Sequence, residues 1–125
     1  MEMLQQKILV VDDERLLTTL MSESLRMEGN FSVEQASNGQ EGLEKYKSFH
    51  PDLVLMDIEM PVMDGYESSR EIKSFDPKAK ILVLTGNPSD HRARKTISEG
   101  IALTLLEKPV RLKELNRIIR EKLSD

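Results

Sequence analysis

The segment 53–57, Leu-Val-Leu-Met-Asp, is a short apolar run that ends at a carboxylate. An uninterrupted apolar run of this length is typical of a strand covered on both faces, as in a parallel sheet between two layers of helices. This requirement for helices on both sides limits the possible folds more than any other feature of the chain. An Asp after a strand often only begins a loop. Any further role for Asp57 therefore depends on the residues that the other strands bring beside it.

Four further strands are predicted from segments rich in β-branched and apolar residues, at 7–11, 31–36, 80–85 and 103–107. The segment 31–36 alternates apolar with polar side chains, which predicts a less covered strand near a sheet edge. Helices are expected between and after the strands, at 15–27, 41–49, 66–75, 91–99 and 111–123. This alternation through short connections indicates right-handed β-α-β units and a doubly wound parallel sheet, the α/β fold class.

Two of the expected helices have informative patterns. In the helix 15–27, an apolar stripe recurs at helical spacing, at Leu17, Leu20, Met21 and Leu25. In the helix 91–99, Ala93 and Ile97 supply the only apolar side chains, and Asp90 is placed to cap its beginning. The fourth helix should therefore be held more loosely than the others.

Length and composition exclude several classes of protein. A chain of 125 residues with 38% apolar residues is expected to form one domain. The net charge of −4 gives no overall case for binding nucleic acid or an anionic membrane. The absence of cysteine excludes thiolate metal sites and a cysteine nucleophile. With no apolar run of transmembrane length and no signal peptide in residues 1–7, a cytoplasmic location is expected.

Polar side chains stand at the ends of four of the strands: Asp12 and Asp13, Asp57, Thr85, and Lys108. Because the carboxyl ends of parallel strands lie along one edge of a sheet, these five side chains should converge. Clustered carboxylates repel one another unless a cation lies between them. Oxygen ligands that do not form a complete cage favour Mg²⁺, with Mn²⁺ as a substitute, and no EF-hand calcium loop is present.

The remaining groups suit phosphoryl transfer. Lys108 offers a point charge and Thr85 a hydroxyl donor to phosphoryl oxygens. This leaves Asp57 as the nucleophile, because a carboxylate can attack phosphorus and form an acyl phosphate. Such a reaction depends mainly on positioning and on neutralising the charge of the transferred group.

The whole chain resembles the receiver domain of bacterial two-component response regulators. Five segments carry the resemblance in the same order: 8–14 (Ile-Leu-Val-Val-Asp-Asp-Glu), 53–57, 60–65 (Met-Pro-Val-Met-Asp-Gly), 82–86 (Leu-Val-Leu-Thr-Gly) and 107–109 (Glu-Lys-Pro). The resemblance implies a flavodoxin-like fold with strand order 2-1-3-4-5. It also implies transfer of a phosphoryl group to Asp57 from a sensor histidine kinase or phosphotransfer protein.

The same resemblance implies particular roles for the site residues. Asp13 and Asp57 would bind Mg²⁺ directly, Asp12 mostly through water, and the backbone carbonyl of Glu59 would complete the protein ligands. The peptide bond Lys108–Pro109 is expected to be cis. Residues 1–125 would be a receiver domain with no output domain, so that the signal leaves through a protein partner. A homodimer through the face formed by the fourth helix, fifth strand and fifth helix is another expectation.

Some positions differ from the family pattern or carry open questions. Leu105 stands where receivers commonly have Tyr or Phe, so it is either a modified switch residue or a plain core leucine. Glu59 and Asn87, each two residues beyond a site residue, are expected to tune the lifetime of the phosphoryl group. The basic run 91–95 is either a partner surface or a solvated helix face.

Two other functions are considered. A phosphatase of the haloacid dehalogenase type also uses an Asp nucleophile, Mg²⁺, Thr and Lys, but its nucleophile opens an Asp-x-Asp motif after the first strand. Here the first strand ends in Asp12-Asp13-Glu14, so turnover of small phosphate esters is not expected. A flavodoxin needs a phosphate-binding loop rich in Ser, Thr and Gly after the first strand, and that loop is missing.

Overall fold

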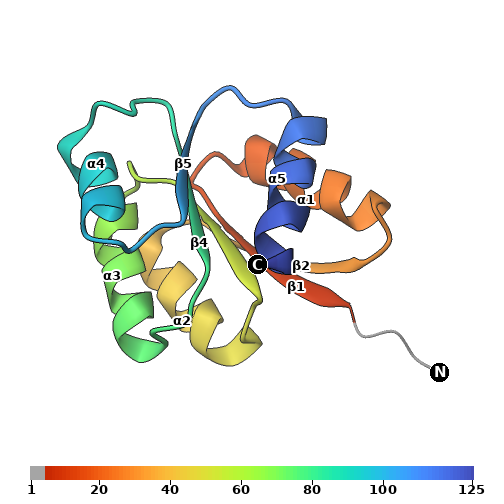
Figure 1. Ribbon diagram of the computed structural model, residues 1–125, viewed down its shortest axis with the longest axis horizontal. Coiled ribbons are helices and arrows are strands. Elements are labelled where there is room, and N and C mark those ends of the chain that lie inside the picture. The colour runs from red at the N-terminus through yellow and green to blue at the C-terminus, as the bar shows by residue number, and fades with distance from the viewer. Residues whose placement is uncertain (1–4) are drawn as a thin grey trace.

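The computed structural model describes residues 5–125, and its centre is a parallel five-stranded sheet with helices on both faces (Figure 1). The strands are β1 (Gln6–Val11), β2 (Phe31–Ala36), β3 (Leu53–Met56), β4 (Ile81–Thr85) and β5 (Thr104–Glu107). Their order is β2-β1-β3-β4-β5, as expected, and β2 is an edge strand. The residues 1–7 were predicted to contain no signal peptide; residues 1–4 of that segment lie outside the described residues.

The helices are α1 (Arg15–Met27), α2 (Gly39–Phe49), α3 (Gly65–Phe75), α4 (His91–Ser98) and α5 (Leu112–Ser124). Helices α2, α3 and α4 cover one face of the sheet, at the left of Figure 1, and α1 and α5 cover the other. The side chains of β3 alternate between the two core halves, with Val54 and Met56 on one side and Leu53 and Leu55 on the other. Burial on both faces explains why β3 is apolar throughout.

The strand register places the predicted site residues along one edge. Val11 pairs with Met56, and Met56 pairs with Val83, so the carboxyl ends of β1, β3 and β4 lie side by side in the sheet. The chain leaves β1 at Asp12 and β3 at Asp57, which are therefore neighbours at the carboxyl edge of the sheet. No helix among residues 5–125 is both long enough and apolar enough to cross a membrane.

The structure differs from the sequence prediction in several details. Helix α2 begins at Gly39 rather than at residue 41, because the Asn38 side chain caps it and accepts a hydrogen bond from the Glu41 N–H (2.9 Å). Leu20 is 47% exposed, and the inward face of α1 runs instead through Thr18, Met21, Ser22 and Leu25. Ile97 is 42% exposed, and Thr96 is the buried partner of Ala93 in α4.

Candidate functional site

Three carboxylates meet at the carboxyl edge of the sheet. Asp12 and Asp57 are buried, whereas Asp13 is exposed. One oxygen from each of these carboxylates lies within 4.8 Å of the others. A set of oxygen ligands around one point, on a surface that water can reach, fits a hard divalent cation that keeps some of its waters. The donor set at this edge therefore matches the Mg²⁺ site that the sequence predicts.

Asp57 is held by the backbone around it. Its N–H donates to the Val11 carbonyl (2.9 Å), and its carboxylate accepts a hydrogen bond from the Ile58 N–H (2.9 Å). Burial and the neighbouring charge of Asp12 raise the pKa of Asp57 to about 7, while Lys108 and the Ile58 N–H oppose the shift. A cation between Asp57 and Asp12 would relieve this repulsion and favour the ionised, nucleophilic form.

Lys108 extends into the same cluster from the residue after β5. Its Nζ donates to Asp12 Oδ2 (2.7 Å) and lies 3.5 Å from Asp57 Oδ1 and 3.4 Å from Glu14 Oε1. Burial would lower the pKa of Lys108, but the hydrogen bond and charges of the carboxylates outweigh burial and raise it. The ammonium group is therefore charged and close to the predicted nucleophile. The Lys108–Pro109 peptide bond is cis, as expected.

A cleft of about 510 Å³ opens over the nucleophile. Asp13, Asp57, Glu59, Thr85 and Lys108 all line it, so the structure brings these predicted residues together on its walls. Asp12 is buried and does not line this cleft, but it contacts Lys108. Thr85 is buried, and its hydroxyl oxygen accepts a hydrogen bond from the Asn87 N–H (3.1 Å). That the backbone carbonyl of Glu59 binds the metal stays a prediction.

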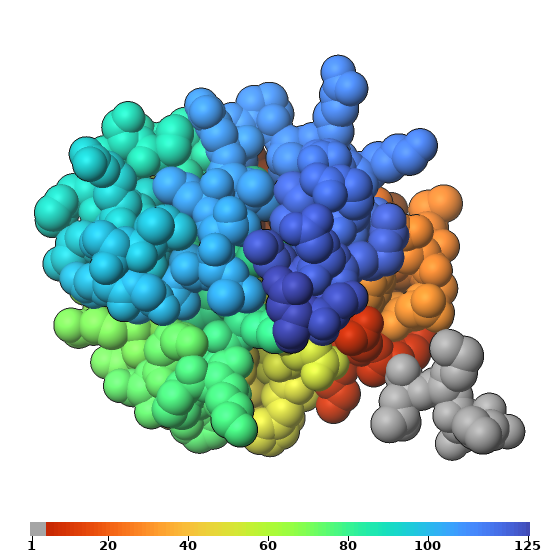
Figure 2. Space-filling view, in the orientation of Figure 1, coloured from red at the N-terminus to blue at the C-terminus, as the bar shows by residue number. Residues whose placement is uncertain are grey.

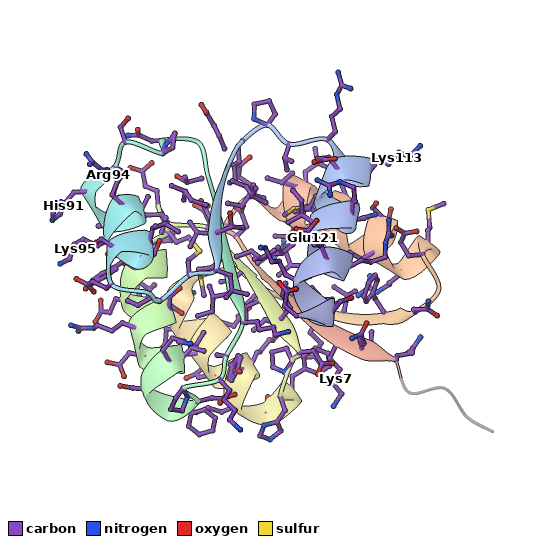
Figure 3. All side chains as sticks on the ribbon, in the orientation of Figure 1. Lys7, His91, Arg94, Lys95, Lys113 and Glu121 are labelled. Atoms are coloured by element: carbon purple, nitrogen blue, oxygen red, sulfur yellow. The ribbon has the colours of Figure 1, made fainter. Side chains whose placement is uncertain are left out.

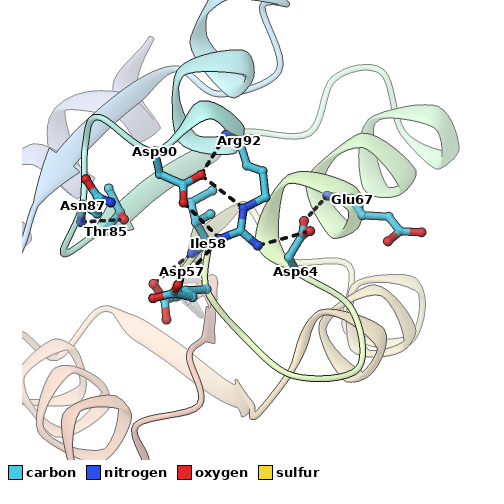
Figure 4. A network of polar contacts seen from close by, with 9 residues as sticks. Asp57, Ile58, Asp64, Glu67, Thr85, Asn87, Asp90 and Arg92 are labelled. Atoms are coloured by element: carbon cyan, nitrogen blue, oxygen red, sulfur yellow. Dashed lines mark hydrogen bonds and ion pairs between the residues drawn. The ribbon is translucent and has the colours of Figure 1, made fainter.

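Sequence reasoning missed one residue at this site, Arg92. Figure 4 shows its guanidinium between Asp90 and Asp64. In the sequence, Arg92 is one member of the basic run 91–95. The available signal was its position two residues after the helix cap Asp90, which places its side chain within reach of the capping carboxylate.

The other basic residues of this run face away from the cleft. His91, Arg94 and Lys95 project outward from α4 in Figure 3. Together with Ile97, Ser98 and Leu105 they line a second, open hollow of about 580 Å³. Figure 2 shows the surface around it, where α4, β5 and α5 lie side by side. Leu105 is half-buried and also packs against the core, so its two interpretations remain open.

Comparison with known proteins identifies the family. Residues 8–120 match the family described as response regulator receiver domain. The chain belongs to the response regulator receiver domain family. It is 39% identical over 95 residues to the chemotaxis protein CheY of Halobacterium salinarum, covering 76% of this chain and 78% of that protein. It is 34% identical over 117 residues to the regulatory protein AtoC of Escherichia coli, but it spans only 25% of that longer protein.

Solved structures agree with this assignment. A CheY-like receiver domain protein from Methanospirillum hungatei has a TM-score of 0.90 and 32% identity, with 96% of this chain and 94% of that chain covered. The response regulator TrrA from Thermotoga maritima, in complex with Mg²⁺ and beryllium fluoride, has a TM-score of 0.81 and 36% identity, with 94% and 99% covered. These matches are all to receiver domains and response regulators, and they give no support to the haloacid dehalogenase alternative.

Proposed function

We propose that this receiver domain is a phosphoacceptor switch in which Asp57 accepts a phosphoryl group in a Mg²⁺-dependent reaction. The observation that carries the proposal is the convergence of three carboxylates, Lys108 and Thr85 around one cleft. The Mg²⁺ and beryllium fluoride bound to the related protein TrrA support it. Beryllium fluoride is anionic and tetrahedral when held by a carboxylate oxygen, and it thus stands in for a phosphoryl group.

Each residue of the site has a distinct task in this reaction. Asp57 attacks phosphorus through a carboxylate oxygen, and the bond from phosphorus to the donor breaks as the acyl phosphate forms. Lys108, 3.5 Å from the Asp57 carboxylate, neutralises charge on a phosphoryl oxygen, and the Thr85 hydroxyl donates to another. Asp12, Asp13, Asp57 and the Glu59 carbonyl would hold Mg²⁺, which supplies further charge neutralisation when bound.

The signal would reach the domain and leave it through protein contacts. We assign the donor to a sensor histidine kinase or phosphotransfer protein and the readout to a downstream protein that distinguishes the two states of the α4, β5 and α5 surface. A homodimer through this surface is an alternative readout. In this proposal the domain catalyses only its own phosphorylation and dephosphorylation, acts in the cytoplasm, and turns over no small phosphate esters.

Intact mass tests the proposal directly. The wild type and Asp57→Asn are incubated with Mg²⁺ and acetyl phosphate, and the wild type alone should gain one phosphoryl group. EDTA should prevent the gain. An adduct that forms equally on both proteins would remove Asp57 from its proposed role.

The lifetime of the phosphoryl group provides a second test of the site. Glu59 and Asn87 line the cleft together with Asp57 and Thr85, where water would reach the acyl phosphate. Glu59→Ala or Asn87→Ala should therefore change the rate of acyl phosphate decay after the donor is removed. Unchanged decay in both variants would exclude these positions as determinants of lifetime.

A further inference from the structure

Arg92 lies among three carboxylates, the rim carboxylates Glu59, Asp64 and Asp90, of which Glu59 and Asp90 line the cleft. Each carboxylate comes from a different part of the fold. Its Nε and Nη2 donate to the two carboxylate oxygens of Asp90 (3.1 and 3.0 Å) at the beginning of α4. Its Nη1 lies 3.6 Å from Asp64 at the beginning of α3. Its Nη2 is 3.9 Å from Glu59 in the connection from β3 to α3. One guanidinium thus bridges three acidic segments. Figure 4 shows it between Asp90 and Asp64.

Two of these carboxylates are themselves fixed by helix capping. Asp64 Oδ1 accepts a hydrogen bond from the Glu67 N–H (2.8 Å), and Asp90 Oδ1 accepts one from the Arg92 N–H (2.8 Å). The planar guanidinium matches such preset acceptors better than a flexible ammonium would. The hydrogen bond with Asp90 raises the pKa of Arg92 and lowers that of Asp90, so both groups stay charged. The position of Arg92 is therefore set by the beginnings of two helices.

This position matters for the charge that an incoming phosphodonor meets. Glu14, Glu59 and Asp90 line the same cleft as Asp57. Lys108 is the basic residue that lines this cleft, and its ammonium group already contacts Asp12 and Glu14. Without Arg92, the rim would present Glu59, Asp64 and Asp90 as uncompensated negative charges. Such a rim would repel an anionic donor before it reached the nucleophile.

We propose that Arg92 is a positioning residue for phosphoryl transfer, which holds and neutralises the rim carboxylates Glu59, Asp64 and Asp90 so that anionic phosphodonors can reach Asp57. This inference rests on the proposed function of Asp57. Arg92 acts through the carboxylates it binds, and it forms no bond with phosphorus. The effect is electrostatic, so it should depend on the charge of the donor and should weaken at high salt.

The test compares Arg92→Gln with Arg94→Gln, a matched control. The control makes the same change two residues away on α4, where Arg94 projects into solvent (Figure 3). Initial rates of phosphorylation are measured by intact mass with acetyl phosphate and with phosphoramidate, which carries less net negative charge near neutral pH. Arg92→Gln should react with acetyl phosphate about 10-fold more slowly than wild type. The loss should be smaller with phosphoramidate, Arg92→Lys should recover part of the rate, and Arg94→Gln should react like wild type.

A double variant separates the electrostatic role from a structural one. The double variant Arg92→Gln with Glu59→Gln lacks the guanidinium and also the negative charge of Glu59, which Arg92 neutralises in the wild type. Its rate with acetyl phosphate should therefore be higher than that of Arg92→Gln alone. Equal losses with both donors and no recovery in the double variant would overturn the inference, because this is the pattern of a damaged fold. A rate for Arg92→Gln equal to that of Arg94→Gln would overturn it as well. Failure of the wild type to gain a phosphoryl group would instead contradict the proposed function itself.

Discussion

At the scale of single residues, the chemistry of this domain depends on keeping a buried carboxylate ionised. Without a metal, burial and the charge of Asp12 raise the pKa of Asp57 from 3.8 to about 7. Because the folded state binds this proton more tightly than the unfolded state, Asp57 destabilises the fold increasingly as pH rises from about 4 to about 7. A charge that the site needs for reaction therefore costs the metal-free protein some of its stability.

The pH dependence of the Asp57→Asn variant tests this argument. Asparagine has nearly the same size but no charge, so in EDTA the variant should be more stable than wild type. The gain should grow from pH 5 to pH 8, because wild-type Asp57 ionises over this range. Urea unfolding at the two pH values measures the difference, and saturating Mg²⁺ should reduce it at pH 8. An equal gain at both pH values would show that Asp57 does not titrate as stated.

Gly65 shows how closely the backbone is packed behind the nucleophile. Its N–H donates to the Ile58 carbonyl (2.8 Å), and a Cβ at this position would lie 1.8 Å from the Asp57 carbonyl oxygen. Gly65→Ala should therefore lower the free energy of unfolding by about 1–3 kcal/mol, as overpacking does. Gly86→Ala is the matched control, because a Cβ there meets no atom within 4 Å. Equal midpoints of urea unfolding for the two variants would contradict the close packing of Gly65.

At the scale of elements, α4 differs from the other helices. It buries only Ala93 and Thr96, whereas α5 buries the larger apolar side chains of Leu115 and Ile119 in the core. Its links to α3 are mostly polar. The Tyr66 hydroxyl donates to Glu99 Oε1 (2.6 Å), the Lys95 ammonium lies 4.7 Å from the Tyr66 ring centroid, and Arg92 approaches Asp64. A helix held by polar contacts at the surface needs less free energy to open locally than a helix held by a buried apolar face.

Hydrogen exchange measures this difference between helices. The amides of α4 should exchange faster than those of α1 and α5, because opening α4 exposes little apolar surface. Tyr66→Phe removes the hydrogen bond to Glu99 and should speed the exchange of α4 by about 2- to 10-fold, with no change in α5. If α4 and α5 exchange at the same rate in the wild type, then α4 is not the loosely held element.

At the scale of the whole molecule, the proposed metal site couples ligand binding to the stability of the fold. The three carboxylates come from the ends of β1 and β3, and they meet only when the sheet is formed. A ligand that binds only the folded state stabilises it by mass action. Mg²⁺ should therefore raise the stability of the entire domain and not only of its loops.

Thermal unfolding in a Mg²⁺ titration tests this coupling. At 100 times its Kd, Mg²⁺ should stabilise the wild type by about 2.7 kcal/mol relative to EDTA. Asp13→Asn removes a ligand that is exposed and has little part in packing, so it should abolish most of this gain while changing stability little in EDTA. A Mg²⁺-dependent gain of the same size in both proteins would mean that the ion binds elsewhere.

Most of the fold could be predicted from the sequence, because the relevant signals are local. The apolar run of β3 and the helical stripes established the alternation of strands and helices. The handedness of β-α-β connections then limited how they could assemble. The exposure of Leu20 and the exposure of Ile97 have the same cause. Both side chains lie at helical spacing beside the buried face, and small polar residues, Thr18 and Thr96, occupy the inward positions instead.

The sequence by itself determined which residues gather at the nucleophile. Asp12, Asp57 and Thr85 stand at the ends of strands, and the ends of parallel strands share one edge whatever the details of packing. Only the tertiary structure decided what surrounds them. Arg92 reaches Glu59 and Asp64, roughly thirty residues earlier in the chain, because α3 and α4 pack side by side. Such ion pairs depend on distances between loops and helix ends, which no local pattern in the sequence records.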